Sequence, residues 1–225
     1  MIPQSRPKLP ALKVRAAIAR ALDGAANGTM PSMAAVNVAA LQKQCPLMLV
    51  ANRAYYLDTM GSLGVNDFGI YDDAAWIVTP DNVLPYNWNC DPSRDGWNAS
   101  LGKPYANLCA GLWPFILGKH KGQYDAFRQP YDEQAKVLKL ETVFKDRRSL
   151  GEFKVKRNNP PHQSFIDESY HAINIHSGSN SGTSSWGCQT CPPAQWHDLQ
   201  SFIYSYMRSH EQKWLPYLLI EGPLS

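Results

Sequence analysis

The sequence predicts a mainly β protein, of the α+β class, with helices flanking the strands at both ends of the chain. Aromatic residues make up 11% of its 225 residues and charged residues only 18%, while Gly (15) and Pro (17) are frequent. This composition favours short strands and turns over long surface helices. Short apolar runs bounded by turn residues fill the middle of the chain, whereas apolar residues at helical spacing occur near its two ends.

Residues 1–45 are predicted to form an N-terminal helical appendage. Apolar residues recur at helical spacing between a proline and a glycine: Pro10, Leu12, Ala16, Ala19, Leu22 and Gly24. Small residues over 24–30 indicate a linker. A second helix is expected to begin with Ser32 as its N-cap.

Residues 46–225 are predicted to form the main domain. Its expected strands cover residues 47–50, 74–78, 83–88, 112–117, 137–144, 152–156 and 172–175. A hairpin turn is predicted over residues 79–82, TPDN. Pro193 starts a predicted helix of about four turns with one apolar face. An apolar segment over 214–220 closes the chain.

Charge and hydropathy argue against two classes of partner. The net charge is only +3, and no run of adjacent basic residues exceeds two, so no nucleic-acid-binding stripe is present. No apolar run reaches the roughly 18–20 residues of a membrane span. The basic N-terminus lacks an unbroken apolar stretch and makes a poor signal peptide. The protein is therefore expected in the cytoplasm unless cell lysis or a secretion system carries it out. The sequence carries no signal for an oligomeric state.

The richest segment in chemistry runs from residue 171 to residue 191, HAINIHSGSNSGTSSWGCQTC. Strand alternation places Asn174 and His176 on one face, and His171 with the isoleucines on the other. A loop of 12 residues (188 − 176) then leads from His176 to Cys188. We expect this loop to return the sulfur to the imidazole, within about 6–7 Å.

A histidine beside a cysteine is the arrangement that cysteine acyl transfer needs. The thiolate is the nucleophile, so a nearby base must take the thiol proton, or the two groups rest as an ion pair. Gly187 is expected to let the backbone approach a substrate carbonyl. The N–H groups of Gly187 and Cys188 are expected to stabilise the oxyanion.

Other interpretations of these residues stay open. His176 and Cys188 could be an unrelated strand-end histidine and structural cysteine. Cys188-x-x-Cys191 could be a redox pair, although no βαβ pattern precedes it. A zinc site would need His171 and His176 on one side of a strand. His120, flanked by lysines and glycines, is either a solvated turn residue or a wall of the cleft. Free, buried thiols are expected for the remaining cysteines, Cys45, Cys90 and Cys109.

The segment 175–178, IHSG, followed by 184–189, SSWGCQ, resembles the signature of the L,D-transpeptidase catalytic-domain family. Upstream segments resemble a phage and prophage branch of that family, and the whole likeness covers roughly residues 50–205. Trp186 stands where the family usually has histidine, and Gln189 where it usually has an aliphatic residue. The resemblance implies an L,D-transpeptidase-like β-sandwich or barrel for residues 46–225.

The resemblance also implies roles for particular residues. Cys188 matches the nucleophile and His176 the base, while Ser185 and Gly187 match the positions beside the nucleophile. The expected substrate-binding residues are Asn174, Ser177, Trp186, Gln189 and His120. The implied reaction is acyl transfer on peptidoglycan stem peptides by an L,D-transpeptidase, L,D-carboxypeptidase or endopeptidase, either phage-derived or an antibacterial effector, without cofactor or metal.

Two alternatives to this activity remain. One is a non-catalytic wall-binding or virion structural module that keeps the fold. The other is a thiol–disulfide oxidoreductase that uses Cys188 and Cys191.

Overall fold

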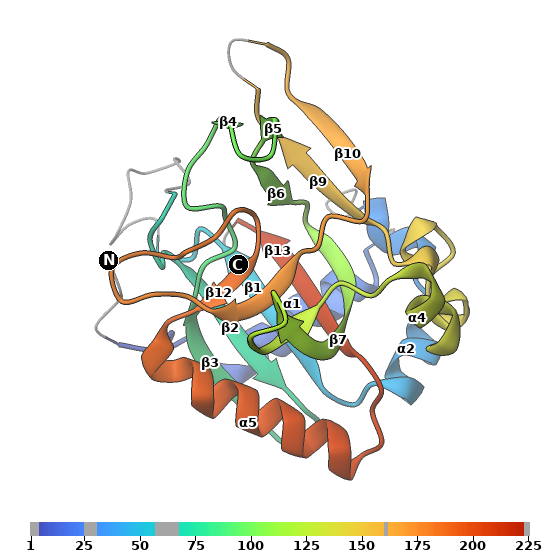
Figure 1. Ribbon diagram of the computed structural model, residues 1–225. Helices are drawn as coiled ribbons and strands as arrows, with labels where there is room; N and C mark the ends of the chain where they lie inside the picture. The colour runs from blue at the N-terminus through green and yellow to red at the C-terminus, as the bar shows by residue number, and fades with distance from the viewer. Residues whose placement is uncertain (1–4, 25–30, 57–67, 160–161, 223–225) are drawn as a thin grey trace.

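The computed structural model describes residues 5–24, 31–56, 68–159 and 162–222 (Figure 1). Its helices are α1 (Ala11–Leu22), α2 (Val38–Gln44), α4 (Asp132–Val137) and α5 (Pro193–Ser209), with 3₁₀ turns at Pro31–Ala35, Leu140–Thr142 and Arg147–Leu150. Its strands are β1 (Met48–Arg53), β2 (Asp73–Val78), β3 (Val83–Trp88), β4 (Trp97–Asn98), β5 (Lys103–Pro104), β6 (Ala106–Leu108), β7 (Gly111–His120), β8 (Tyr124–Arg128), β9 (Phe153–Arg157), β10 (Phe165–Ser169), β11 (Asn174–Ser177), β12 (Gln189–Cys191) and β13 (Leu215–Glu221).

An eight-stranded sheet forms the body of the molecule, in the order β12-β11-β8-β7-β13-β1-β2-β3. Two pairs are parallel, β1 with β13 and β11 with β12. A bridge between Asn89 and Thr190 joins the end of β3 to β12, so that the sheet is nearly closed into a barrel. The mainly β fold with flanking helices is thereby confirmed. A three-stranded sheet, β10-β9-β6, stands at the top of Figure 1.

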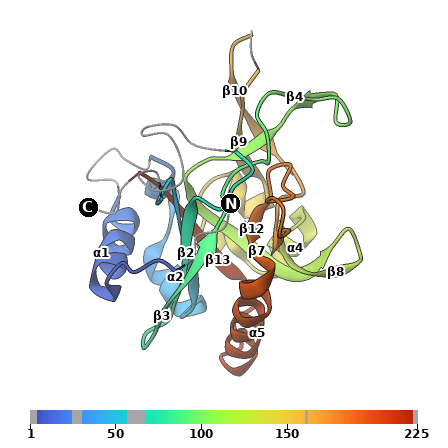
Figure 2. The same cartoon turned by 90° about the vertical axis from the view of Figure 1, so that its left-hand side faces the viewer.

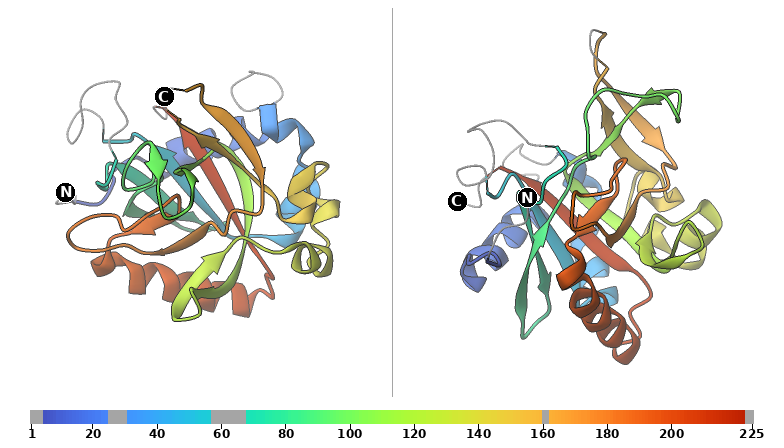
Figure 3. Two further views of the ribbon diagram at one scale, coloured as in Figure 1. Left: turned by 45° about the horizontal axis from the view of Figure 1, so that its top comes forward. Right: turned by 60° about the vertical axis from the view of Figure 1, so that its left-hand side comes forward.

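Both faces of the large sheet are covered. α5 and the three-stranded sheet contribute Ile203 and Phe153 to one core, together with Tyr217 of β13. α1 and α2 contribute Val14 and Leu41 to a second core on the opposite face. Figures 2 and 3 show these helices on the far side of the sheet from α5. Burial on both faces explains why β1 and β2 are buried along their whole length. Among the described residues, no helix is long and apolar enough to cross a membrane.

The prediction of a strand over residues 137–144 is wrong. Val137 ends helix α4 and is 82% exposed. Lys139 has a positive φ of 53°, and a 3₁₀ turn then buries Leu140, Val143 and Phe144. These buried positions lie three and four residues apart, so the apolar pattern fits a helical turn as well as a strand.

The N-terminal helices differ in detail from the prediction. α1 forms as expected, but Leu12 is 81% exposed, and the buried face consists of Val14, Ala17 and Ala21. α2 begins at Val38, with Asn37 instead of Ser32 as its N-cap. The rest of the predicted linker, residues 25–30, lies outside the described residues. The predicted turn at 79–82 is confirmed by a hydrogen bond of 3.0 Å from the Thr79 N–H to the Asn82 carbonyl. The helix predicted to begin at Pro193 is confirmed as α5.

Candidate active site

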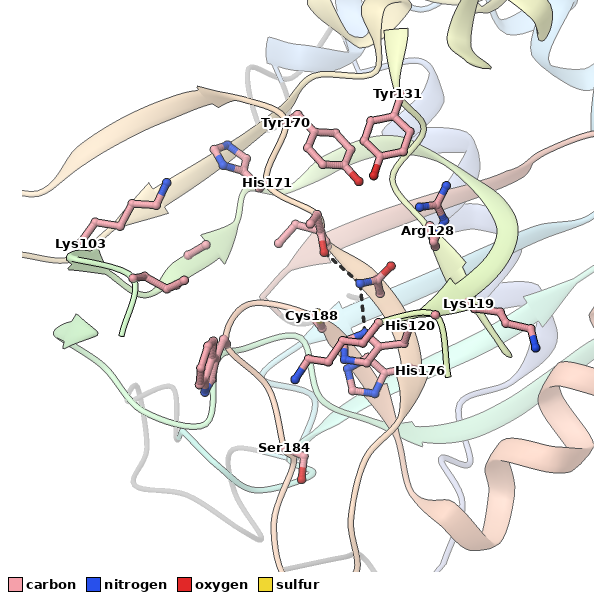
Figure 4. Close-up of a pocket in the computed structure, with 18 of the residues that line it drawn as sticks. Lys103, Lys119, His120, Arg128, Tyr131, Tyr170, His171, His176, Ser184 and Cys188 are labelled. Atoms are coloured by element: carbon pink, nitrogen blue, oxygen red, sulfur yellow. Dashed lines mark hydrogen bonds between the residues drawn. The ribbon is translucent and has the colours of Figure 1, made fainter. Parts of the chain in front are cut away.

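A cavity of about 620 Å³ opens where β7, β11 and the loop before β12 meet. Five of the predicted catalytic and substrate-binding residues line it: His120, Asn174, His176, Trp186 and Cys188. Figure 4 shows His120, His176 and Cys188 close together at its base. The cavity is large enough for a small-molecule or peptide ligand.

The imidazole and the sulfur meet as the sequence predicted. Ring nitrogens of His120 and His176 and the sulfur of Cys188 all lie within 4.8 Å of one another. His176 is buried, whereas Cys188 is partly exposed. Cys188 therefore lines the cavity with a base beside its sulfur, which is the arrangement that nucleophilic catalysis requires.

Strand alternation in β11 directs these side chains. Asn174 and His176 face the cavity, as predicted, while Ile173 and Ile175 lie in the core. The expectation for His171 is wrong, because β11 begins only at Asn174 and Ala172 has a positive φ of 55°. The alternation is broken at that point, and His171 also lines the cavity.

The hydrogen bond to one ring nitrogen of His176 sets its tautomer. Nδ1 lies 2.7 Å from the Ser177 carbonyl oxygen, which can only accept, so Nδ1 carries the proton. Nε2 then holds the lone pair. It is buried without a hydrogen-bond partner among the described residues. Ser177 therefore orients the base through its backbone, and its side chain does not line the cavity.

Burial makes the resting pair neutral. It lowers the pKa of His176 to about 4, with smaller contributions from His120 and Lys121. Burial also raises the pKa of the Cys188 thiol, although the neighbouring Asn174 opposes the shift. At pH 7 both shifts favour thiol and imidazole over thiolate and imidazolium.

Alkylation of Cys188 by iodoacetamide is therefore expected to accelerate as the pH rises through 9, without a plateau in mildly acidic solution. The reason is that a raised thiol pKa delays formation of the reactive thiolate. Mass spectrometry of the Cys188 peptide would follow the rate. In His176→Gln the rate should change little. A plateau of reactivity below about pH 7 that disappears in this variant would show a resting ion pair instead.

His120 belongs to the site and is not a solvated turn residue. The predicted strand over 112–117 runs on to residue 120, because β7 pairs with β8 beyond Gly118. The rings of His120 and His176 lie 4.3 Å apart. The amide of Asn174 donates to His120 Nδ1 at 3.1 Å and to the Ala172 carbonyl at 2.9 Å. His120 therefore carries its proton on Nε2.

Gly187 and Ser185 shape the turn before the nucleophile in a way the sequence did not predict. The Gly187 N–H donates to Ser185 Oγ at 3.0 Å, and this hydroxyl donates to the Cys188 carbonyl at 2.6 Å. The expected oxyanion role of the Gly187 N–H is thus not supported, because that donor is already engaged. Gly187 has a φ of +133°, and a Cβ there would lie 2.5 Å from the Ala106 carbonyl oxygen. The space that this glycine leaves open is therefore occupied by the backbone of Ala106.

Of the two predicted substrate-binding residues Trp186 and Gln189, only Trp186 lines the cavity. Trp186 is 51% exposed on the cavity wall, with the Lys121 ammonium 5.7 Å from its ring centre. Gln189 is fully buried and does not line the cavity, so the structure does not support a substrate-binding role. Its side chain donates to the Cys90 carbonyl and accepts from the Tyr217 hydroxyl.

The other cysteines do not line the cavity. All five cysteines are free. Cys45, Cys90 and Cys191 are buried, whereas Cys109 is only partly buried. Burial raises the pKa of Cys191, and this thiol does not line the cavity. A sealed partner counts against a redox pair, since thiol–disulfide exchange needs access to the attacked sulfur.

Two groups of side chains in the described part of the chain have metal-ligand spacing. His120, His176 and Cys188 form one. In the sequence analysis, His171 and not His120 was the second histidine of such a site. The hydrogen bonds of this first group favour acid–base chemistry, because the Asn174 amide occupies the His120 Nδ1 lone pair. Asp72, Asp73 and Asp91 form the other, buried group, and Asp91 is ion-paired with Arg53.

Several cavity residues were missed by the sequence analysis. Arg128, Tyr131 and Tyr170 line it from β8 and from the segments after β8 and β10. No motif marks them. Arg128 could have been found only from the register, which pairs it with Asn174 across β8 and β11. Searches with this sequence matched no protein-family model and no curated protein.

Proposed function

We propose that the protein is a cysteine enzyme that transfers the acyl group of peptidoglycan stem peptides. The observation that carries the proposal is His176 itself: a ring nitrogen lies within 4.8 Å of the Cys188 sulfur at the cavity, and Nε2 has no hydrogen-bond partner among the described residues. The tautomer makes Nε2 a base, and the low pKa keeps it unprotonated at neutral pH. The choice of stem peptides rests on the resemblance of residues 175–189 to the L,D-transpeptidase signature.

The reaction would begin from the neutral pair. As the Cys188 sulfur attacks a peptide carbonyl, His176 Nε2 takes the thiol proton. The proton then passes to the departing amine, and a thioester remains on Cys188. Water or a second amine attacks the thioester and releases the acyl group. With water the outcome is peptidase activity, and with an amine it is transpeptidation.

The oxyanion needs a donor other than the Gly187 N–H, which Ser185 holds. His120 is suited to this role, since its protonated Nε2 belongs to a ring beside the sulfur. Lys121 adds positive charge at the same side of the cavity and lowers the pKa of the Cys188 thiol. Ser185 is a positioning residue in this scheme.

Incubation of the protein with purified muropeptides is expected to change their masses. Loss of a terminal residue would indicate a carboxypeptidase, cleavage of a cross-link an endopeptidase, and exchange of a terminal residue a transpeptidase. Mass spectrometry of the products distinguishes the three. Muropeptides that keep their masses, with and without an added amino acid as acceptor, would contradict the proposal.

A further inference from the structure

All the Lys, Arg, Asp and Glu side chains that line the cavity beside Cys188 are basic. Its basic residues are Lys103, Lys119, Lys121, Arg128 and Arg157, and no Asp or Glu of the described chain lines it. The whole sequence has 22 basic and 19 acidic residues, so this segregation far exceeds the overall excess. Arg157 is balanced by Asp167 at 2.6 Å. The remaining charge makes the cavity attractive to anions.

Arg128 is a cation of this cavity that lies across the sheet from a residue of the site. It is the cross-strand neighbour of Asn174, and such neighbours share one face of the sheet. Asn174 in turn lies beside the Cys188 thiol and lowers its pKa. Within the described ranges, no carboxylate forms an ion pair with Arg128, and its guanidinium lies 3.5 Å from Gln134 Oε1.

The direction of the Arg128 side chain is fixed by its surroundings. It crosses Gly118, where a Cβ would lie 2.5 Å from its Nε. Its guanidinium lies 5.2 Å from the ring centre of Tyr131. Glycine at position 118 therefore leaves the space through which the arginine reaches the cavity.

Two tyrosines complete this end of the cavity. The rings of Tyr131 and Tyr170 are stacked with their centres 4.5 Å apart, and Figure 4 shows both hydroxyls on the side of Arg128. Both side chains are more than a third exposed, at 45% and 37%. A hydrogen bond with Tyr170 and one with Arg128 lower the pKa of Tyr131. A guanidinium next to phenol donors is a suitable receptor for a carboxylate.

We propose that Arg128, Tyr131 and Tyr170 bind a carboxylate of the substrate and so select acidic peptides. The inference rests on the proposed function and makes it more specific. Because Arg128 and Cys188 line the same cavity, an anion bound at Arg128 can belong to the same peptide whose carbonyl Cys188 attacks. The carboxylate is either the chain terminus or an acidic side chain, and both offer the same chemistry to the guanidinium.

Peptides amidated at one carboxylate at a time would test the proposal. We expect amidation of the recognised group to lower kcat/KM roughly 10- to 100-fold, the usual value of a charged hydrogen bond. The position at which amidation lowers kcat/KM shows whether the recognised carboxylate is the chain terminus or an acidic side chain. Arg128→Gln should show the same loss with the acidic peptide and become indifferent to amidation. Arg208→Gln, which removes an exposed arginine of α5, should discriminate as the wild type does.

Binding to the Cys188→Ala protein separates this inference from the proposed function. Calorimetric titration should give a Kd for the acidic peptide roughly 10-fold or more below that for the amide, and this difference should vanish in Cys188→Ala/Arg128→Gln. If Cys188→Ala/Arg128→Gln does not fold, the same titrations are made with Arg128→Lys, which keeps the charge, or Tyr131→Phe in its place. Equal affinity for acid and amide would overturn the inference even if turnover is observed. Preference for the acid without any turnover would uphold it and refute the enzyme.

Discussion

Replacing Cys188 by alanine is expected to abolish turnover of stem peptides, with kcat falling by roughly 10⁴- to 10⁶-fold. In the proposed reaction the sulfur holds the acyl group, and no other thiol among the described residues lines the cavity. His176→Ala should cost about 10²- to 10⁴-fold, because the thiol then loses its base. The two losses should not add in the double variant, since base and nucleophile act as one unit.

The measurement is the rate of product formation by mass spectrometry, beside a thermal unfolding curve for each variant. Cys109→Ala is the matched control, because it removes a thiol that is also partly exposed but lies outside the cavity. It should keep full activity. Unchanged turnover in Cys188→Ala would refute the enzyme and leave the wall-binding or virion structural module as the better interpretation.

The largest expected effect on stability comes from Arg53→Met. The Arg53 side chain is 7% exposed, and its Nε lies 3.0 Å from a carboxylate oxygen of Asp91, which is fully buried. The guanidinium also contacts Glu221 and donates to the Leu108 carbonyl at 2.8 Å. Removing one partner of such a buried pair leaves the other charge uncompensated and costs about 3–5 kcal/mol.

The surroundings of Arg53 strengthen this expectation. Asp72, Asp73 and Asp91 lie together near it, and burial and the two neighbouring carboxylates raise the pKa of Asp73. Without the guanidinium, these carboxylates would repel one another in a site shielded from water. The protein should then take up protons on folding and become less stable as the pH rises.

Urea unfolding would measure the loss of Arg53. Arg147→Met is the control, because Arg147 forms an exposed ion pair with Glu152 and its removal should leave the unfolding midpoint almost unchanged. A midpoint for Arg53→Met within error of the wild type would show that the buried cluster is compensated in another way.

The sequence predicted correctly those elements whose apolar pattern is compatible with only one type of secondary structure. The apolar run of β2, the turn after it and the return strand β3 form as expected, and so does α5 behind its proline. The apolar pattern of residues 137–144 fits both the helical and the strand period. Packing against the second core favours the 3₁₀ turn over a strand. The buried face of α1 was missed because alanines can lie on either side of a short helix.

The amino-acid sequence by itself determined that Asn174 and His176 share a face and that a loop carries Cys188 back to them. These are properties of one strand and the loop that follows it, so alternation and chain length are sufficient to predict them. The tertiary structure alone decided that His120 and Arg128 join the site and that the Gly187 N–H is already engaged. These depend on the pairing of β7, β8 and β11 and on hydrogen bonds in a closed turn. Such contacts join residues distant in the chain, or depend on side-chain directions that no local pattern encodes.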